Sequence, residues 1–102
     1  MQPIITENRE KIAELCRQHH VRRLSVFGSA VREDFDPERS DVDMIVEFEP
    51  LPYPDSVDNY WSLEDALKAL FARKVDLIRD GLVRNPYLLR EIRAEQETLY
   101  AA

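Results

Sequence analysis

Apolar and polar residues alternate most regularly over residues 41–48, and this alternation predicts a β-strand. One face of the strand carries Val42, Met44, Val46 and Phe48, whereas the opposite face carries Asp41, Asp43, Ile45 and Glu47. Shorter apolar runs predict two further strands, at residues 22–27 and 74–79. A glycine interrupts the chain after each of these two strands, at Gly28 and at Gly81.

Helices are predicted between the strands, where apolar residues recur every three or four positions. The first covers residues 6–20, with Thr6 as N-cap and with Cys16 and His19 facing the core. A short helical stretch is expected at residues 30–32. The next long helix follows a proline-rich loop and carries one apolar stripe, formed by Tyr60, Leu63, Leu67, Leu70 and Phe71. The last helix starts after an N-cap and a first-turn proline, Asn85 and Pro86, and carries Leu88, Leu89, Ile92 and Leu99.

The resulting order α-β-α-β-α-β-α predicts an α/β (α+β) fold with a small mixed sheet and with helices packed on one side. A chain of 102 residues fits one domain, so we expect residues 1–102 to form a single domain.

Composition excludes several classes of protein. The formal net charge of −6 argues against a protein that coats DNA or RNA, which needs a positive field. The single cysteine, Cys16, excludes an internal disulfide and a cysteine-rich metal cluster, and it favours a reducing, cytoplasmic compartment. No apolar run is long enough for a membrane helix, and the N-terminus lacks the apolar core of a signal peptide, so no membrane association is expected.

The acidic residues are unevenly distributed. Twelve of the twenty lie between Glu33 and Asp65, a segment with one basic residue, Arg39. Most residues of such a segment form a solvated face, and Asp34 and Asp36, which precede Pro37, are typical of a turn.

Asp41 and Asp43 differ from the other acidic residues because they open a strand. Residues two apart on a strand point to the same face, with their side chains rooted roughly 7 Å apart. Two such carboxylates disfavour each other's ionised form unless a cation lies between them, and oxygen ligands on a rigid strand suit Mg²⁺ better than Zn²⁺. Asp76 offers a third strand carboxylate, although a lone strand aspartate is more typical of a solvent-facing position.

Gly28 and Ser29 follow a strand directly, as phosphate-binding residues often do. Glycine lets a phosphate approach the backbone, and serine adds a hydroxyl group. A Gly-Ser pair alone is usually a plain turn. Combined with three strand carboxylates, it completes the set of groups that two-metal phosphoryl transfer requires.

The stretch FGSAVREDFDPERSDVDMIVEF, followed by KVDLI, resembles the minimal nucleotidyltransferase (MNT) family of the DNA polymerase β-like superfamily. The family signature is Gly-Ser, a spacer, Asp-x-Asp on a strand and a third Asp on a later strand. The resemblance implies the nucleotidyltransferase fold. It implies that Gly28 and Ser29, assisted by Arg32, hold the phosphates of ATP. It also implies that Asp41, Asp43 and Asp76 bind two Mg²⁺ ions and carry the catalysis.

The resemblance further implies a partner. MNT proteins of this kind are antitoxins that transfer AMP from ATP to a tyrosine hydroxyl of a HEPN-domain ribonuclease toxin, so we expect a hetero-oligomer and no direct nucleic-acid binding. Two alternatives are a non-catalytic antitoxin that neutralises its partner by contact, and a small acidic domain without a site. The partner surface is predicted at residues 49–61, which contain Leu51, Tyr53, Tyr60 and Trp61. For Tyr60 and Trp61, the alternative is that they cover the core.

Overall fold

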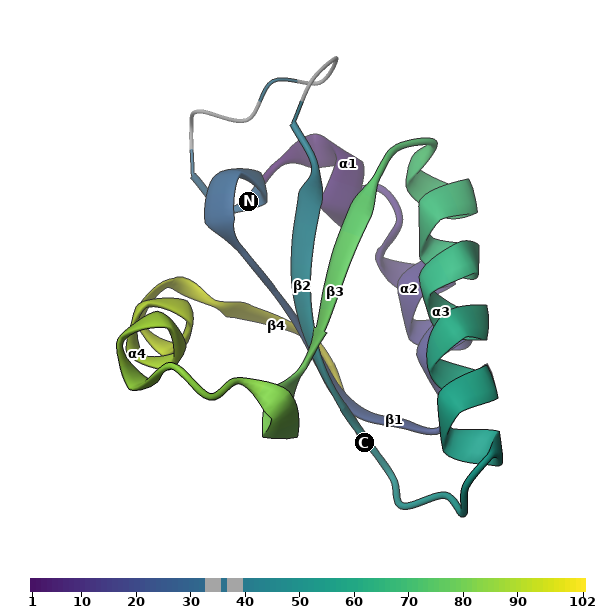
Figure 1. Ribbon diagram of the computed structural model, residues 1–102. Helices are drawn as coiled ribbons and strands as arrows, with labels where there is room; N and C mark the ends of the chain where they lie inside the picture. The colour runs from purple at the N-terminus through teal and green to yellow at the C-terminus, as the bar shows by residue number, and fades with distance from the viewer. Residues whose placement is uncertain (33–35, 37–39) are drawn as a thin grey trace.

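The computed structural model describes residues 1–32, 36 and 40–102. Within these residues, four strands form one sheet in the order β3-β2-β1-β4 (Figure 1). The strands are β1 (Val21–Phe27), β2 (Val42–Phe48), β3 (Val75–Arg79) and β4 (Glu97–Ala101). β1 runs antiparallel to β2 and β4, whereas β2 runs parallel to β3, so the mixed sheet expected from the sequence is confirmed.

Helices connect and cover these strands. They are α1 (Pro3–Thr6), α2 (Arg9–Gln18), α3 (Asp55–Phe71) and α4 (Pro86–Glu95), with 3₁₀ turns η1 (Gly28–Ala30) and η2 (Asp80–Leu82). A parallel pair of strands needs a long crossover, and α3 provides it between β2 and β3. α4 begins as predicted, because the Asn85 side chain accepts hydrogen bonds from the backbone N–H groups of Tyr87 and Leu88.

The main core lies between the sheet and helices α1 to α3. The alternating apolar face of β2 is buried there, against Leu24, Val26, Leu63, Leu67 and Phe71. Cys16 is also fully buried, as expected, and burial raises the pKa of its thiol to about 12. His19 is half-buried and links two helices, since its ring nitrogens contact the Leu15 carbonyl and the Ser62 hydroxyl.

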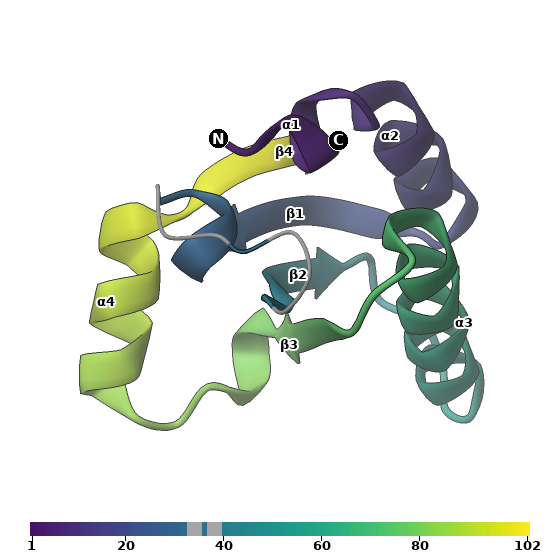
Figure 2. The same cartoon turned by 90° about the horizontal axis from the view of Figure 1, so that it is seen from above.

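The last helix covers the opposite face of the sheet. Figure 2 shows α4 on one side of the strands, and α2 and α3 on the other. Ile92 of α4 packs with Phe27 and Ile45 in a second, smaller core. The prediction that the helices pack on one side is therefore wrong for α4. Ile45, an apolar residue on the aspartate-bearing face of β2, requires this cover.

Three predicted boundaries also need correction. Leu99 belongs to β4 rather than to the last helix, because Gln96 is extended (φ −62°, ψ 145°) and ends α4. Thr6 ends α1 instead of capping one long helix, which Glu7 and Asn8 divide into two. The short helix expected at residues 30–32 is the three-residue turn η1, which starts at Gly28. In the part of the chain that is described, no helix has the length and apolarity that crossing a membrane requires.

Candidate active site

Asp43 lies between two neighbours across the sheet. It pairs with Phe27 on β1 and with Asp76 on β3. Paired residues of adjacent strands point to the same face, so the carboxylates of Asp43 and Asp76 lie together on the face that α4 partly covers. Asp41 immediately precedes β2 and is two residues from Asp43, so it stands on the same side. The three aspartates predicted from the sequence are therefore neighbours in the fold.

Gly28 approaches this group from the end of β1. It is buried and has a φ of +72°, a conformation that side chains other than hydrogen disfavour. A Cβ atom built on Gly28 would lie 2.6 Å from Oδ2 of Asp43. Glycine is thus needed here both for its backbone conformation and because a carboxylate packs against its Cα atom. Ser29 follows in η1 and is half-exposed.

Asp43 is in an environment that disfavours its negative charge. Burial raises the pKa of its carboxyl group, and the negative charges of Asp76 and Asp41 raise the pKa further. The positive charge of Arg32 opposes this shift. A carboxylate destabilised by two others gains from a cation bound among them, which is the situation expected at a metal site.

The donor set fits Mg²⁺ in chemistry, since all three side chains offer hard oxygen atoms. Among the described side chains, no three His, Cys, Asp or Glu residues already converge as a formed metal cluster. Asp76 is exposed, and Asp41 and Asp43 are half-buried, so their carboxylates border solvent. Binding of Mg²⁺ by Asp41, Asp43 and Asp76 therefore stays a prediction from the sequence.

Two basic residues in the turn between α3 and β3 lie beside Asp41. The Lys74 ammonium is 3.9 Å from Oδ2 of Asp41. Arg73 donates a hydrogen bond to the backbone carbonyl of Ser40 at 3.4 Å. No motif in the sequence identifies either residue, because their place beside Asp41 follows from the parallel pairing of Val42 with Val75.

Glu95, the last residue of α4, also reaches the site. Its Oε1 atom accepts a hydrogen bond from the backbone N–H of Gly28, and its Oε2 atom pairs with Arg32, both at 2.9 Å. Arg32 thus lies close to Gly28, which is the location that the predicted phosphate-binding role of Arg32 requires. Glu95 was missed from the sequence, where no motif or spacing connects it with residues 28–32.

The Ser40 hydroxyl accepts a hydrogen bond from the Asp36 N–H at 2.8 Å. Asp34, the other member of the first Asp-x-Asp pair, lies outside the described residues.

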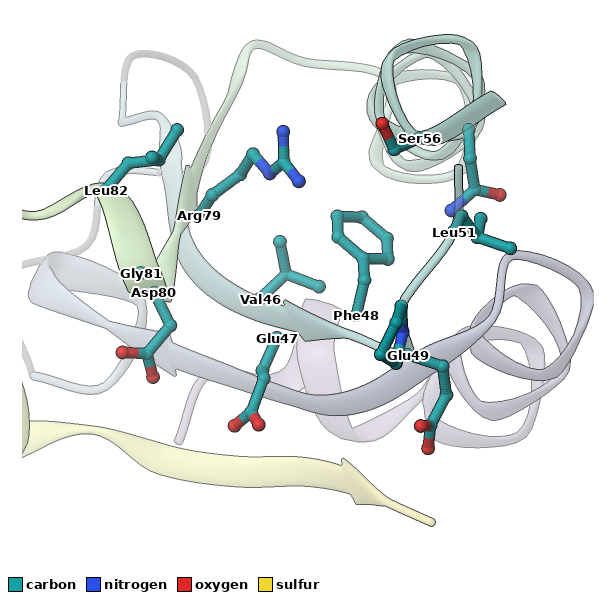
Figure 3. A pocket seen from close by; sticks show the side chains of 12 residues that line it. Val46, Glu47, Phe48, Glu49, Leu51, Ser56, Arg79, Asp80, Gly81 and Leu82 are labelled. Carbon is teal, nitrogen blue, oxygen red and sulfur yellow. The ribbon is translucent and has the colours of Figure 1, made fainter. Parts of the chain in front are cut away.

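A separate cavity of about 370 Å³ opens at the carboxyl ends of β2 and β3 (Figure 3). Its lining includes Phe48, Leu51, Ser56, Arg79 and Leu82, and does not include Asp41, Asp43 or Asp76. The predicted partner segment borders this cavity through Leu51. Within that segment, Tyr53 is 83% exposed and Trp61 is 54% exposed. Tyr60 instead packs on the core and donates its hydroxyl to the Leu77 carbonyl.

Comparison with known proteins agrees with this arrangement. The chain is 34% identical over 97 residues to the protein adenylyltransferase MntA of Thermococcus cleftensis, covering 90% of this chain and 89% of MntA. It superposes on a structure described as a minimal nucleotidyltransferase with a TM-score of 0.76, at 28% identity and over 95% of both chains.

It also has the fold of a chain from the complex of tri-AMPylated Shewanella oneidensis HEPN toxin with MNT antitoxin. That match has a TM-score of 0.66 and 20% identity, and covers 96% of this chain and 73% of the other. Residues 9–100 match the family described as the nucleotidyltransferase domain, a span that includes all three aspartates and the Gly28–Ser29 pair. The chain therefore belongs to the nucleotidyltransferase domain family.

Proposed function

We propose that this protein is a Mg²⁺-dependent adenylyltransferase that transfers AMP from ATP to a tyrosine hydroxyl of a cognate HEPN toxin, and so acts as its antitoxin. The observation that carries the proposal is the pairing of Asp43 with Asp76, together with the contact of Asp43 with Gly28, which brings two carboxylates and the turn after β1 to the same end of the sheet. The match to MntA, named a protein adenylyltransferase, supports the reaction. The fold shared with the HEPN–MNT complex supports the partner.

In this proposal the chain holds the triphosphate at the turn after β1. The backbone of Gly28, the hydroxyl of Ser29 and the guanidinium of Arg32 orient the phosphates. Asp41 and Asp43 hold Mg²⁺ beside them, and Asp76 completes the ligand set towards the acceptor. When bound, Mg²⁺ supplies positive charge that stabilises both the entering and the leaving oxygen atoms.

The reaction balances without any further reagent. The acceptor hydroxyl oxygen forms a bond to the α-phosphorus of ATP, the bond from that phosphorus to the bridging oxygen breaks, and pyrophosphate leaves. In the proposed reaction Asp76 would orient the hydroxyl and take its proton, a role supported by its being the most exposed of the three carboxylates. We expect this activity in the cytoplasm, where ATP and Mg²⁺ are available.

The partner surface that we assign is the segment 49–61, in which Leu51 lines the cavity of Figure 3 and Tyr53 is exposed. Exposed aromatic side chains are typical anchors of protein interfaces.

The decisive experiment incubates the protein with its HEPN partner, Mg²⁺ and ATP labelled on the α-phosphate. We expect label on a tyrosine of the partner with the wild-type protein and none with Asp43→Asn. Asp65→Asn, a change at an exposed position of α3 outside residues 49–61, is the matched control and keeps the activity. If the protein neutralises the toxin without transferring label, a non-catalytic binding antitoxin replaces the proposed enzyme.

A further inference from the structure

Glu95 brings a negative charge to two donors that an incoming phosphate would use. Its carboxylate oxygens lie 2.9 Å from the Gly28 nitrogen and 2.9 Å from Nη1 of Arg32. One of these donors is a backbone N–H in the left-handed turn after β1, and the other is a guanidinium group. Carboxylate and phosphate oxygens accept the same charge-assisted hydrogen bonds from such donors.

We propose that the Glu95 carboxylate occupies the position of a triphosphate oxygen in the nucleotide-free protein, and that ATP binds by displacing it. The inference rests on the proposed function, since it assumes that ATP binds at Gly28 and Arg32. It adds to that site a competitor that belongs to the protein itself, the Glu95 carboxylate at the end of α4.

The exposure of the pair is consistent with such an exchange. The side chains of Arg32 and Glu95 are 52% and 33% exposed, so their ion pair is partly hydrated. Partly exposed ion pairs contribute little to stability, and a triphosphate with several negative charges competes well for the same guanidinium. Glu95 is the last residue of α4, and the extended Gln96 follows it, so no further helical turn holds its side chain in place.

Calorimetric titration of Mg²⁺–ATP into three proteins tests the inference. Glu95→Gln keeps the shape of the side chain and removes its charge, and Glu95→Ala also removes the hydrogen bond to Gly28. We expect the Kd to fall at least about threefold in both variants, because the ligand no longer displaces a charged competitor. Mg²⁺ with inorganic tripolyphosphate, which lacks the nucleoside, should show the same decrease.

Asp80→Asn is the matched control. Asp80 pairs with Arg93 of the same helix at 2.9 Å and likewise ties α4 to the sheet, but it does not contact Gly28 or Arg32. Its Kd for Mg²⁺–ATP should equal that of the wild type. An equal decrease in the Asp80→Asn variant would show that loosening of α4, and not loss of a competing charge, improves binding, and would overturn the inference.

A spectroscopic measurement distinguishes displacement of the Glu95 carboxylate by ATP from a purely structural role of Glu95. The chain has two glycines, so the Gly28 amide signal is readily assigned in a ¹H–¹⁵N spectrum. We expect Glu95→Gln to shift this signal without nucleotide, and ATP to bring the wild type and the variant to similar positions. If the wild type binds ATP and Glu95→Gln binds it equally or more weakly, Glu95 only fastens α4 to η1, and this inference alone fails. If neither protein binds Mg²⁺–ATP, the proposed function fails, and this inference with it.

Discussion

The Asp43 carboxylate packs against the Cα atom of Gly28, so close that a Cβ atom there would lie 2.6 Å from Oδ2 of Asp43. This contact joins the end of β1 to the carboxylate at the start of β2. It makes the backbone of the turn that we propose for phosphate binding and the position of the Asp43 carboxylate depend on each other.

Gly28→Ala should therefore damage both stability and binding. The new methyl group forces Asp43 aside, and the φ of +72° is unfavourable for alanine, so we expect a loss of roughly 1–3 kcal/mol in the free energy of unfolding. Mg²⁺–ATP binding should be lost even at temperatures where the variant is folded. Gly81→Ala is the control: no described atom lies within 4 Å of its Cβ position, so stability should change little. Chemical denaturation of both variants measures the difference.

Asp43→Asn should stabilise the metal-free protein at neutral pH. Since the folded-state pKa of Asp43 is raised above its ordinary value of 3.8, this group favours the fold below that pH, and the benefit is lost as pH rises through the folded-state pKa. Asparagine removes this pH dependence. Thermal unfolding in EDTA should show a Tm a few degrees above the wild type at pH 7 and a smaller difference near pH 3. A lower Tm at pH 7 would contradict the assignment of unfavourable charge to this position.

Nucleotide binding should depend on a divalent cation. Without one, Asp41, Asp43 and Asp76 repel the negatively charged triphosphate. Calorimetry with ATP should detect binding in the presence of Mg²⁺ and at least about tenfold weaker binding in EDTA. Equal affinity under both conditions would mean that the three carboxylates do not hold the metal.

Asp76→Asn should abolish AMP transfer while affecting ATP binding less than Asp41→Asn or Asp43→Asn does. Asp76 is exposed, so we expect the acceptor to approach on its side, whereas Asp43 contacts Gly28 in the turn proposed to hold the phosphates. Loss of one ligand and its charge at the acceptor side should lower the rate at least ~10²-fold. Single-turnover transfer assays, combined with titration of ATP, separate the two effects. Transfer by Asp76→Asn at the wild-type rate would show that Asp76 is a surface residue without a part in the reaction.

Replacement of both Leu51 and Tyr53 by serine should weaken the complex with the HEPN partner. Tyr53 is 83% exposed, and Leu51 lines the rim of a cavity, so neither is part of the buried core. We expect a loss of roughly 1–3 kcal/mol in binding free energy, with Tm and ATP affinity nearly unchanged. A lower Tm with unchanged partner affinity would show that these residues serve packing instead.

The sequence predicted the carboxylate site because strand geometry alone places Asp41 and Asp43 on one face. The partnership of Asp43 with Asp76 is a matter of register between strands that α3 joins, and the pattern of single strands does not contain it. The contact of Glu95 with Gly28 is even harder to predict from the sequence, since it depends on where α4 ends against the sheet.

The errors in the predicted fold have local causes. The sequence pattern predicts a helix through β4 because Leu99 continues the spacing of Leu88 and Ile92, and neither glycine nor proline separates Glu95 from Glu97. Its strand conformation comes from pairing with β1, which is a long-range contact. Ile45 is the sequence signal for a helix on the second face of the sheet, because it is an apolar residue on a face that is otherwise expected to be polar.

Among the described residues, β3 forms one edge of the sheet and pairs with a single neighbour, β2. An edge strand of five residues is a natural place for local opening, and opening would carry Asp76 away from Asp43. A cation held by both carboxylates binds only while the strand is closed, and so it protects the edge in proportion to its concentration. The amide protons of β3 should then exchange with solvent more slowly in Mg²⁺ than in EDTA, while those of β4, at the opposite edge, should be unaffected.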